Sequence, residues 1–134
     1  LSISSDNDMT IFNAIVPIDS EKAYDPNNVK CALNKNTNTI QYFSRKALLN
    51  SIEPNTQHYY KQLGLYALSY KNLNIFSGYM QMNLELAEKV ELLRWIEYGH
   101  IIKPITLDIT TISVDTPQDF IDALSLLEEN LQND

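Results

Sequence analysis

The sequence contains little glycine and almost no cysteine, and each scarcity excludes a class of site. Its three glycines are isolated from one another, so no glycine-rich loop for nucleotide phosphates can be drawn in the chain. Cys31 is the single cysteine, which excludes an intrachain disulfide and a thiolate zinc cluster. Because its neighbours include Val29, Ala32 and Leu33, we expect a buried strand thiol.

Positive charge and long apolar runs are also scarce. The formal net charge is −7 and lysine and arginine form no stripe, so nucleic acid is not expected as a partner. An anionic sugar acid or nucleotide would need a local cluster of cations such as Arg45, Lys61 and Arg94. Since no apolar run reaches transmembrane length and no signal-peptide pattern opens the chain, we expect a cytoplasmic protein without membrane contact.

The length of 134 residues predicts one domain at most. Residues 1–8 are polar and turn-forming, which is typical of a flexible start or linker. Residues 9–134 form the predicted folded unit. The chain begins with Leu1 instead of Met, so we expect a fragment, a processed product or the ordered part of something longer.

Strand-like and helix-like segments alternate along the chain, which predicts an α/β fold with a mixed β-sheet flanked by helices. The residues 20–27 form a loop with room for one helical turn, and 45–58 is a long connection. The predicted strands are 10–18, ended by Pro17, then 29–33 and 40–44 as a hairpin, 62–69, and one or two within 101–111, broken at Pro104. The predicted helices are 71–79, 84–98 and 116–131.

The segment 84–98 carries the strongest helical pattern. Apolar residues recur there every three or four positions, and Gly99 is placed to end the helix. Glu91 and Arg94 are three residues apart, so they could form an ion pair on its surface. His58 and His100 match no common metal-ligand spacing, and we assign both to structure or solvent.

An acid follows the apolar run near the C-terminus, in the sequence Val-Asp-Thr-Pro at 114–117. Thr116 and Pro117 suit the start of a helix, so Asp115 would lie at the carboxyl end of a strand, where ligands and metals bind in open α/β sheets. A well-capped helix with an incidental acid explains the same pattern. Both interpretations stay open at this point.

Five segments, spread over roughly residues 9–127, resemble the C-terminal half of the CMP-Kdo synthetase family, the 3-deoxy-manno-octulosonate cytidylyltransferases. They are Asn-Val-Lys at 28–30, Tyr-Phe-Ser-Arg at 42–45, Lys-Gln-Leu-Gly-Leu-Tyr-Ala-Leu at 61–68, the run at 84–94 and Val-Asp-Thr-Pro at 114–117. The resemblance implies half of a nucleotide-diphospho-sugar transferase-like, Rossmann-like fold. It also implies a sugar-binding and dimerisation role for 9–134, in an enzyme that makes CMP-Kdo from CTP and Kdo for lipopolysaccharide or capsule synthesis.

The resemblance also implies roles for individual residues. Asp115 would be a catalytic residue by binding Mg²⁺ through its carboxylate, and the intact enzyme would be a homodimer. The residues implied to bind the sugar acid are Arg45, Gln62, Tyr66, Glu91 and Arg94.

The sequence departs from the family pattern at several positions. The family usually has His where Gln62 stands, Gln where Leu92 stands and Gly where Ser113 stands, and 46–49 lacks two expected prolines. No segment matches the family's CTP phosphate loop or its second metal-binding aspartate. We therefore expect this chain alone to be inactive, and a non-catalytic remnant or dimerisation module is the alternative.

Overall fold

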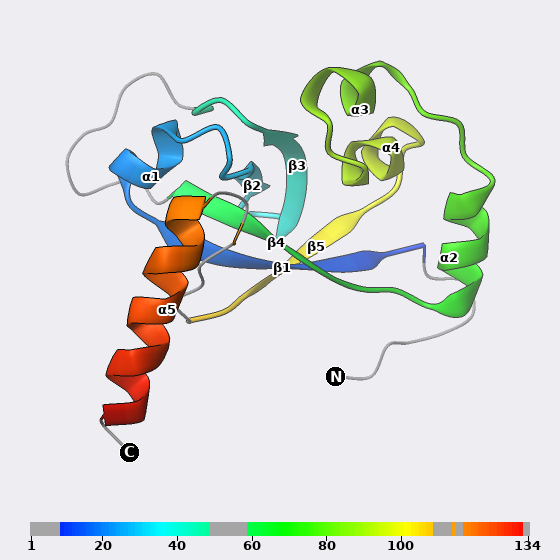
Figure 1. The fold of residues 1–134 in the computed structure, drawn as a ribbon. Helices are drawn as coiled ribbons and strands as arrows, with labels where there is room; N and C mark the ends of the chain where they lie inside the picture. Colours follow the sequence, from blue (N-terminus) through cyan, green and yellow to red (C-terminus); the bar gives the residue numbers. More distant parts are fainter. Residues whose placement is uncertain (1–8, 49–58, 109–113, 115–116, 133–134) are drawn as a thin grey trace.

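The computed structural model describes residues 9–48, 59–108, 114 and 117–132, and its centre is a mixed β-sheet (Figure 1). The order of the described strands is β1-β4-β2-β3-β5, and β5 closes back onto β1. β5 pairs with β1 in parallel, and the other neighbours are antiparallel, as the sequence predicted for a mixed sheet. The strands are β1 (Ile11–Ile18), β2 (Lys30–Asn34), β3 (Thr39–Ser44), β4 (Tyr59–Ala67) and β5 (Ile102–Thr106).

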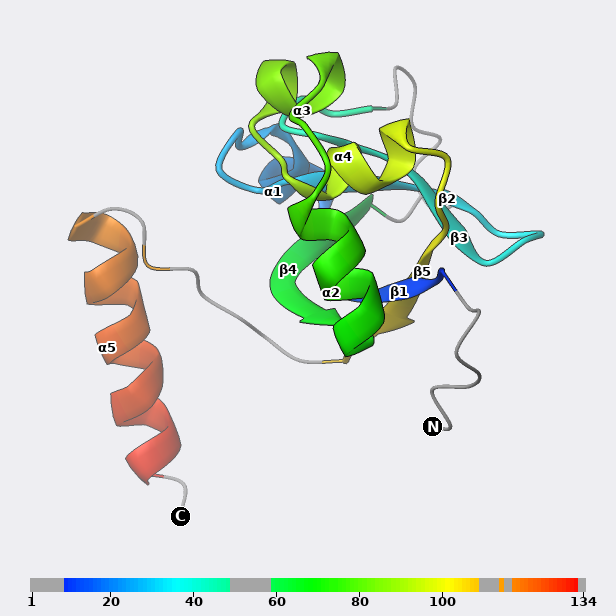
Figure 2. The same ribbon diagram turned by 90° about the vertical axis from the view of Figure 1, so that its right-hand side faces the viewer.

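Helices flank this sheet, which confirms the predicted α/β class. α3 and α4 lie next to each other on one side of the sheet (Figures 1 and 2), and α5 stands away from the sheet in the view of Figure 2. Among the helices in the described part of the chain, none is both long and apolar enough to cross a membrane. The helices are α1 (Ser20–Tyr24), α2 (Tyr70–Ser77), α3 (Asn83–Glu88), α4 (Leu92–Glu97) and α5 (Pro117–Gln132).

The predicted hairpin is present as β2 and β3. Their register runs from Lys30 opposite Ser44 to Asn34 opposite Thr39. The Asn34 side chain accepts the backbone N–H groups of residues 36 and 37, and Asn38 takes a left-handed conformation with φ of 52°. An asparagine-rich turn can provide both features, since asparagine bonds to nearby backbone and tolerates positive φ.

Two prolines expected to break strands lie inside them instead. Pro17 pairs with Tyr60 of β4, and Pro104 lies in β5 opposite Asn13. The β1–β5 register ends at Ile15, and β3 meets β5 only at Ile102, so each proline lies beyond the reach of one neighbouring strand. A proline is tolerated where its missing N–H faces no ladder partner.

The single helix predicted over 84–98 is wrong, because the chain forms α3 and α4 with a break between them. Lys89 adopts a left-handed conformation with φ of 58°, and its N–H bonds to the carbonyl of Glu85. Val90 and Leu92 are both buried behind this break. They would lie about 200° apart around a continuous helix, so a straight helix could not bury both on one side.

The core lies between the sheet and the α3–α4 pair. Trp95 is fully buried, and its indole N–H donates to the Ile101 carbonyl at 3.3 Å. Cys31 is buried as predicted, and burial raises the pKa of its thiol. The buried cluster consists of Ile11, Ile15, Cys31, Ile40, Phe43, Val90, Leu92, Leu93, Trp95 and Ile102.

Gly99 ends α4 as the sequence predicted. Its φ of 80° is left-handed, and its N–H donates to the Ile96 carbonyl at 2.8 Å. The N–H of His100 reaches back to the Trp95 carbonyl. This pair of bonds is the Schellman arrangement, for which glycine is preferred.

Candidate functional site

Gln62 and Tyr66, both predicted to bind substrate, contact each other across a bulge in β4. The register pairs Tyr66 with Asn13 and Gln62 with Ile15, so residues 63–65 of β4 all face one residue of β1. The side-chain nitrogen of Gln62 donates to the Tyr66 hydroxyl at 3.2 Å. The oxygen of the same amide is buried and has no partner among the described residues.

The Tyr66 phenol lies close enough to the Glu91 carboxylate for an electrostatic interaction between them. Burial, then the nearby Glu91 and Cys31, raise the pKa of Tyr66, so the phenol is neutral at pH 7. Its oxygen accepts from Gln62, which leaves its own O–H to donate elsewhere. Together with the acceptor oxygens of Gln62 and Glu91, this arrangement suits a ligand with several hydroxyl groups.

Arg45 follows β3 and is held by backbone carbonyls. Its Nε donates to the Glu88 carbonyl at 3.0 Å, and its Nη1 donates to the Pro26 carbonyl at 3.2 Å. The Arg45 backbone N–H donates to the Glu88 carboxylate at 2.9 Å. Among the described residues these bonds use only part of the guanidinium, and its other N–H groups could meet an anionic ligand.

Glu88 is a residue whose position the sequence did not reveal. Besides Arg45, its carboxylate accepts from the hydroxyls of Ser44 at 3.2 Å and Tyr42 at 3.4 Å. It therefore fastens the end of α3 to the end of β3.

Lys30 is a second residue that sequence reasoning missed, although the Asn-Val-Lys motif drew attention to it. Its side chain is almost fully buried, and its ammonium donates to the carbonyls of Asp25 and Arg45. Burial lowers the pKa of Lys30; the nearby Arg45 lowers it too, and Asp25 and Glu88 oppose the shift. Lys30 thus holds the Arg45 backbone from inside.

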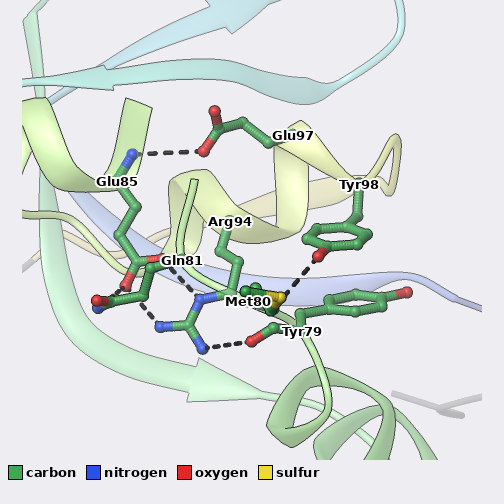
Figure 3. A network of polar contacts seen from close by, with 7 residues as sticks. All are labelled: Tyr79, Met80, Gln81, Glu85, Arg94, Glu97 and Tyr98. Carbon is green, nitrogen blue, oxygen red and sulfur yellow. Dashed lines mark hydrogen bonds and ion pairs between the residues drawn. The ribbon is translucent and has the colours of Figure 1, made fainter. Parts of the chain in front are cut away.

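The expected ion pair between Arg94 and Glu91 is wrong, because Arg94 pairs with Glu85 (Figure 3). Two guanidinium nitrogens donate to the two oxygens of the Glu85 carboxylate, one of them at 2.6 Å. The guanidinium also lies over the Phe76 ring, 4.6 Å from its centre. The helix break at Lys89 lets α3 pack against α4, so Arg94 reaches a carboxylate nine residues earlier in the chain. A sugar-binding role for Arg94 remains a prediction.

The rest of this network joins α3 to α4. The Arg94 bonds lower the pKa of Glu85, burial opposes them, and a bond from Gln81 adds to the lowering. The Glu97 carboxylate accepts the backbone N–H of Leu84 at 3.0 Å and that of Glu85 at 3.4 Å, and Figure 3 shows the second of these bonds. It caps the start of α3, where Met82 cannot supply an oxygen.

His100 has a structural place, as predicted. Its Nε2 is hydrogen bonded to the Tyr79 hydroxyl, and its ring lies 4.5 Å from that of Trp95. Burial lowers the pKa of His100. Tyr79 in turn stacks on Tyr98 at 3.7 Å. His58, the other histidine, lies outside the described residues.

Asp115 also lies outside the described residues, together with Ser113 and Thr116. Within the described ranges, no three histidine, cysteine, aspartate or glutamate side chains gather closely enough to hold a metal ion. The assignment of Mg²⁺ to Asp115 stays a prediction.

Leu92, one of the departures from the family pattern, is a core residue. Its side chain is only 3% exposed and belongs to the buried cluster. Glu91 beside it is exposed. The polar contact that the resemblance implies at position 92 is thus replaced by apolar packing.

Comparisons with known proteins agree on one family. The chain is 41% identical over 113 residues to the 3-deoxy-manno-octulosonate cytidylyltransferase of Bacteroides thetaiotaomicron, covering 80% of this chain and 43% of the relative. It is 35% identical over 129 residues to the enzyme of the same name from Phocaeicola vulgatus, covering 90% of this chain and 50% of the relative. An 8-amino-3,8-dideoxy-manno-octulosonate cytidylyltransferase of Shewanella halifaxensis is 38% identical over 101 residues, covering 75% of this chain and 41% of the relative.

A solved structure agrees with these relatives. A CMP:2-keto-3-deoxy-manno-octonic acid synthetase complexed with CTP superposes with a TM-score of 0.79 and 26% identity, covering 90% of this chain and 49% of that chain. No family model matches the sequence. The resemblance inferred from the motifs is confirmed, and the chain spans about half the length of the curated relatives it matches.

Proposed function

Because the chain belongs to the 3-deoxy-manno-octulosonate cytidylyltransferases over the residues matched, we propose that it supplies the sugar-acid-binding half of such an enzyme. The whole enzyme would join CTP and a 3-deoxy-octulosonate to form the CMP-sugar and pyrophosphate. Its product would serve lipopolysaccharide or capsule synthesis, and the protein would be cytoplasmic. The similarity over four fifths of the chain is the observation that carries the proposal.

The side chains at β4 and at the start of α4 could provide the hydrogen-bonding groups that a sugar acid needs. A sugar hydroxyl needs both a donor and an acceptor, and Tyr66 offers an O–H beside the acceptor oxygens of Gln62 and Glu91. Arg45, fastened to the end of α3 by its bond to the Glu88 carbonyl, would offer N–H groups to the carboxylate of the sugar acid. These residues would hold the sugar so that its anomeric oxygen faces the nucleotide, which is catalysis by positioning.

Asp115 is the residue of this chain that we propose to bind Mg²⁺. A carboxylate after a strand suits this ion, which binds few protein carboxylates together with substrate oxygens. When bound, the ion would neutralise negative charge on the phosphates. The CTP phosphates themselves would be held by residues that have no counterpart in this chain.

The alternative is a non-catalytic remnant or a dimerisation module. The burial of Leu92 favours it, because an apolar core residue stands where the family places a sugar-contacting Gln. Gln62 also favours this alternative, because glutamine cannot titrate near neutral pH as the histidine usual at this position can.

A chimera separates the two proposals. The matched segment of the Bacteroides thetaiotaomicron relative would be replaced by this chain, and pyrophosphate release from CTP, Kdo and Mg²⁺ would be measured. We expect turnover by the chimera, none by the 134-residue chain alone, and nearly none by the chimera carrying Asp115→Asn, with its unfolding midpoint unchanged. A chimera that folds and binds CTP but releases no pyrophosphate would favour the non-catalytic alternative.

A further inference from the structure

The bulge in β4 leaves two carbonyl groups that β1 cannot bond in a regular ladder. Residues 63–65 face a single residue of β1, so the usual one-to-one pairing is lost there. The side-chain nitrogen of Asn13 donates to both carbonyls, to Leu63 at 2.9 Å and to Leu65 at 3.3 Å. Asn13 is 0% exposed, so water cannot replace these bonds.

The bulge brings Gln62 and Tyr66 together. Residues four apart in a regular strand are separated by about 13 Å, and side chains standing upright on it would stay nearly that far apart. Here the Gln62 amide reaches the Tyr66 hydroxyl at 3.2 Å. The local shortening of β4 between them accounts for this contact, since bulges bend a strand and redirect its side chains.

We propose that Asn13 is a positioning residue for the sugar-acid site: its carboxamide holds the β4 bulge that sets Gln62 beside Tyr66. It acts through the backbone of Leu63 and Leu65 and touches no ligand. This inference rests on the proposed function for the identity of the ligand. The geometric part, from Asn13 to the Gln62–Tyr66 contact, stands without it.

The unpaired oxygen of Asn13 supports this assignment. The Oδ1 atom is buried and has no partner among the described residues, which costs stability. An aliphatic residue would avoid that cost but could not donate to the two carbonyls. The position therefore requires the donor, and asparagine supplies it.

The test compares Asn13→Ala and Asn13→Asp with a matched control, Asn72→Ala. Asn72 is also a buried asparagine that donates to a backbone carbonyl, that of Thr10 at 3.2 Å, away from the bulge. Free Kdo would be titrated into each protein by calorimetry. We expect both Asn13 variants to bind Kdo about tenfold more weakly or worse, and Asn72→Ala to bind it like the wild type.

A second readout follows Tyr66 directly. Its ring signals, assigned in NMR spectra with Tyr66→Phe, should shift in the Asn13 variants toward those of an exposed tyrosine and stay in place in Asn72→Ala. Unshifted Tyr66 signals in folded Asn13 variants would overturn the inference. Shifted signals in a chain whose wild type binds no Kdo would support the positioning geometry and contradict the proposed function instead.

If neither Asn13 variant folds, NMR of the wild-type protein can still test the two hydrogen bonds of the Asn13 side chain. Scalar couplings across the two hydrogen bonds should join the Asn13 side-chain nitrogen to the carbonyl carbons of Leu63 and Leu65. Their absence, with fast exchange of the Asn13 amide protons, would overturn the inference.

Discussion

At the residue scale, the side chains of Lys30, Glu85 and Arg94 are buried or nearly buried, and each has a hydrogen-bond partner. Lys30 donates to backbone carbonyls, and Glu85 pairs with Arg94. Lysine and glutamate residues are rarely fully buried unless they are paired, so sequence reasoning did not predict the burial of Lys30 and Glu85. Cys31 and the Gly99 cap could be predicted, because each depends on its immediate neighbours only.

The Glu85–Arg94 pair should stabilise the fold measurably. Glu85→Gln leaves the Arg94 charge largely buried without its partner, so we expect a loss of about 3 kcal/mol in the free energy of unfolding. Glu91→Gln, at an exposed position, is the control and should change that free energy by less than about 0.5 kcal/mol. Urea unfolding measures both. Equal effects of the two substitutions would show that the buried pair contributes no more than a surface charge.

His100 should make the protein less stable in acid. Burial lowers the pKa of His100, so below pH about 6.5 the unfolded chain takes up this proton before the folded chain does. The free energy of unfolding should then fall as the pH drops through that window, and the fall should be smaller in His100→Gln. Urea unfolding between pH 8 and 5 measures this, with His58→Gln as the control. The same slope in wild type and His100→Gln would contradict the assignment.

At the element scale, the hairpin, the mixed sheet and the helix at 117–132 could be predicted from local patterns. The two errors, the broken helix and the prolines inside strands, share a cause. Each depends on contacts with other elements. The prolines fit because the strand pairing beside them ends, and the helix breaks because the core buries both Val90 and Leu92. One sequence does not contain that information locally, because tertiary packing overrides helical spacing.

Lys89 is the residue on which the break between α3 and α4 depends. Its left-handed backbone is strained for a residue with a Cβ atom, and its side chain is exposed. Lys89→Gly should therefore raise the free energy of unfolding by about 0.5–1 kcal/mol, because glycine relieves the strain and no side-chain packing is lost. Lys89→Ala keeps the Cβ atom and should bring no gain. A destabilised Lys89→Gly variant would mean that the lysine side chain holds the turn.

At the scale of the whole molecule, the family was identifiable from motifs, while the site was identifiable only in part. Tyr66 contacts Gln62 and lies near Glu91, while the binding of a sugar acid by these residues stays a prediction. The supporting residues Asn13, Lys30 and Glu88 come from other elements, and only the fold reveals them. Asp115 remains a prediction from the sequence.

Exposed apolar side chains on α5 predict self-association of the chain. Phe120, Ile121 and Leu124 are each about half exposed on a helix that stands away from the sheet (Figure 2). We expect a homodimer by light scattering, and a shift toward monomer in Ile121→Glu. Gln118→Glu, at an exposed polar position of the same helix, should leave the mass unchanged. A monomer mass for the wild type at high concentration would contradict the prediction.

The most direct test of the sugar-acid site is a titration of free Kdo into the 134-residue chain, followed by NMR at each backbone amide. The account predicts saturable shifts centred on Gln62, Tyr66 and Glu91, lost in Tyr66→Phe combined with Glu91→Gln, and absent when a neutral hexose replaces Kdo. A folded chain whose β4 and α4 signals do not move at any Kdo concentration would contradict it.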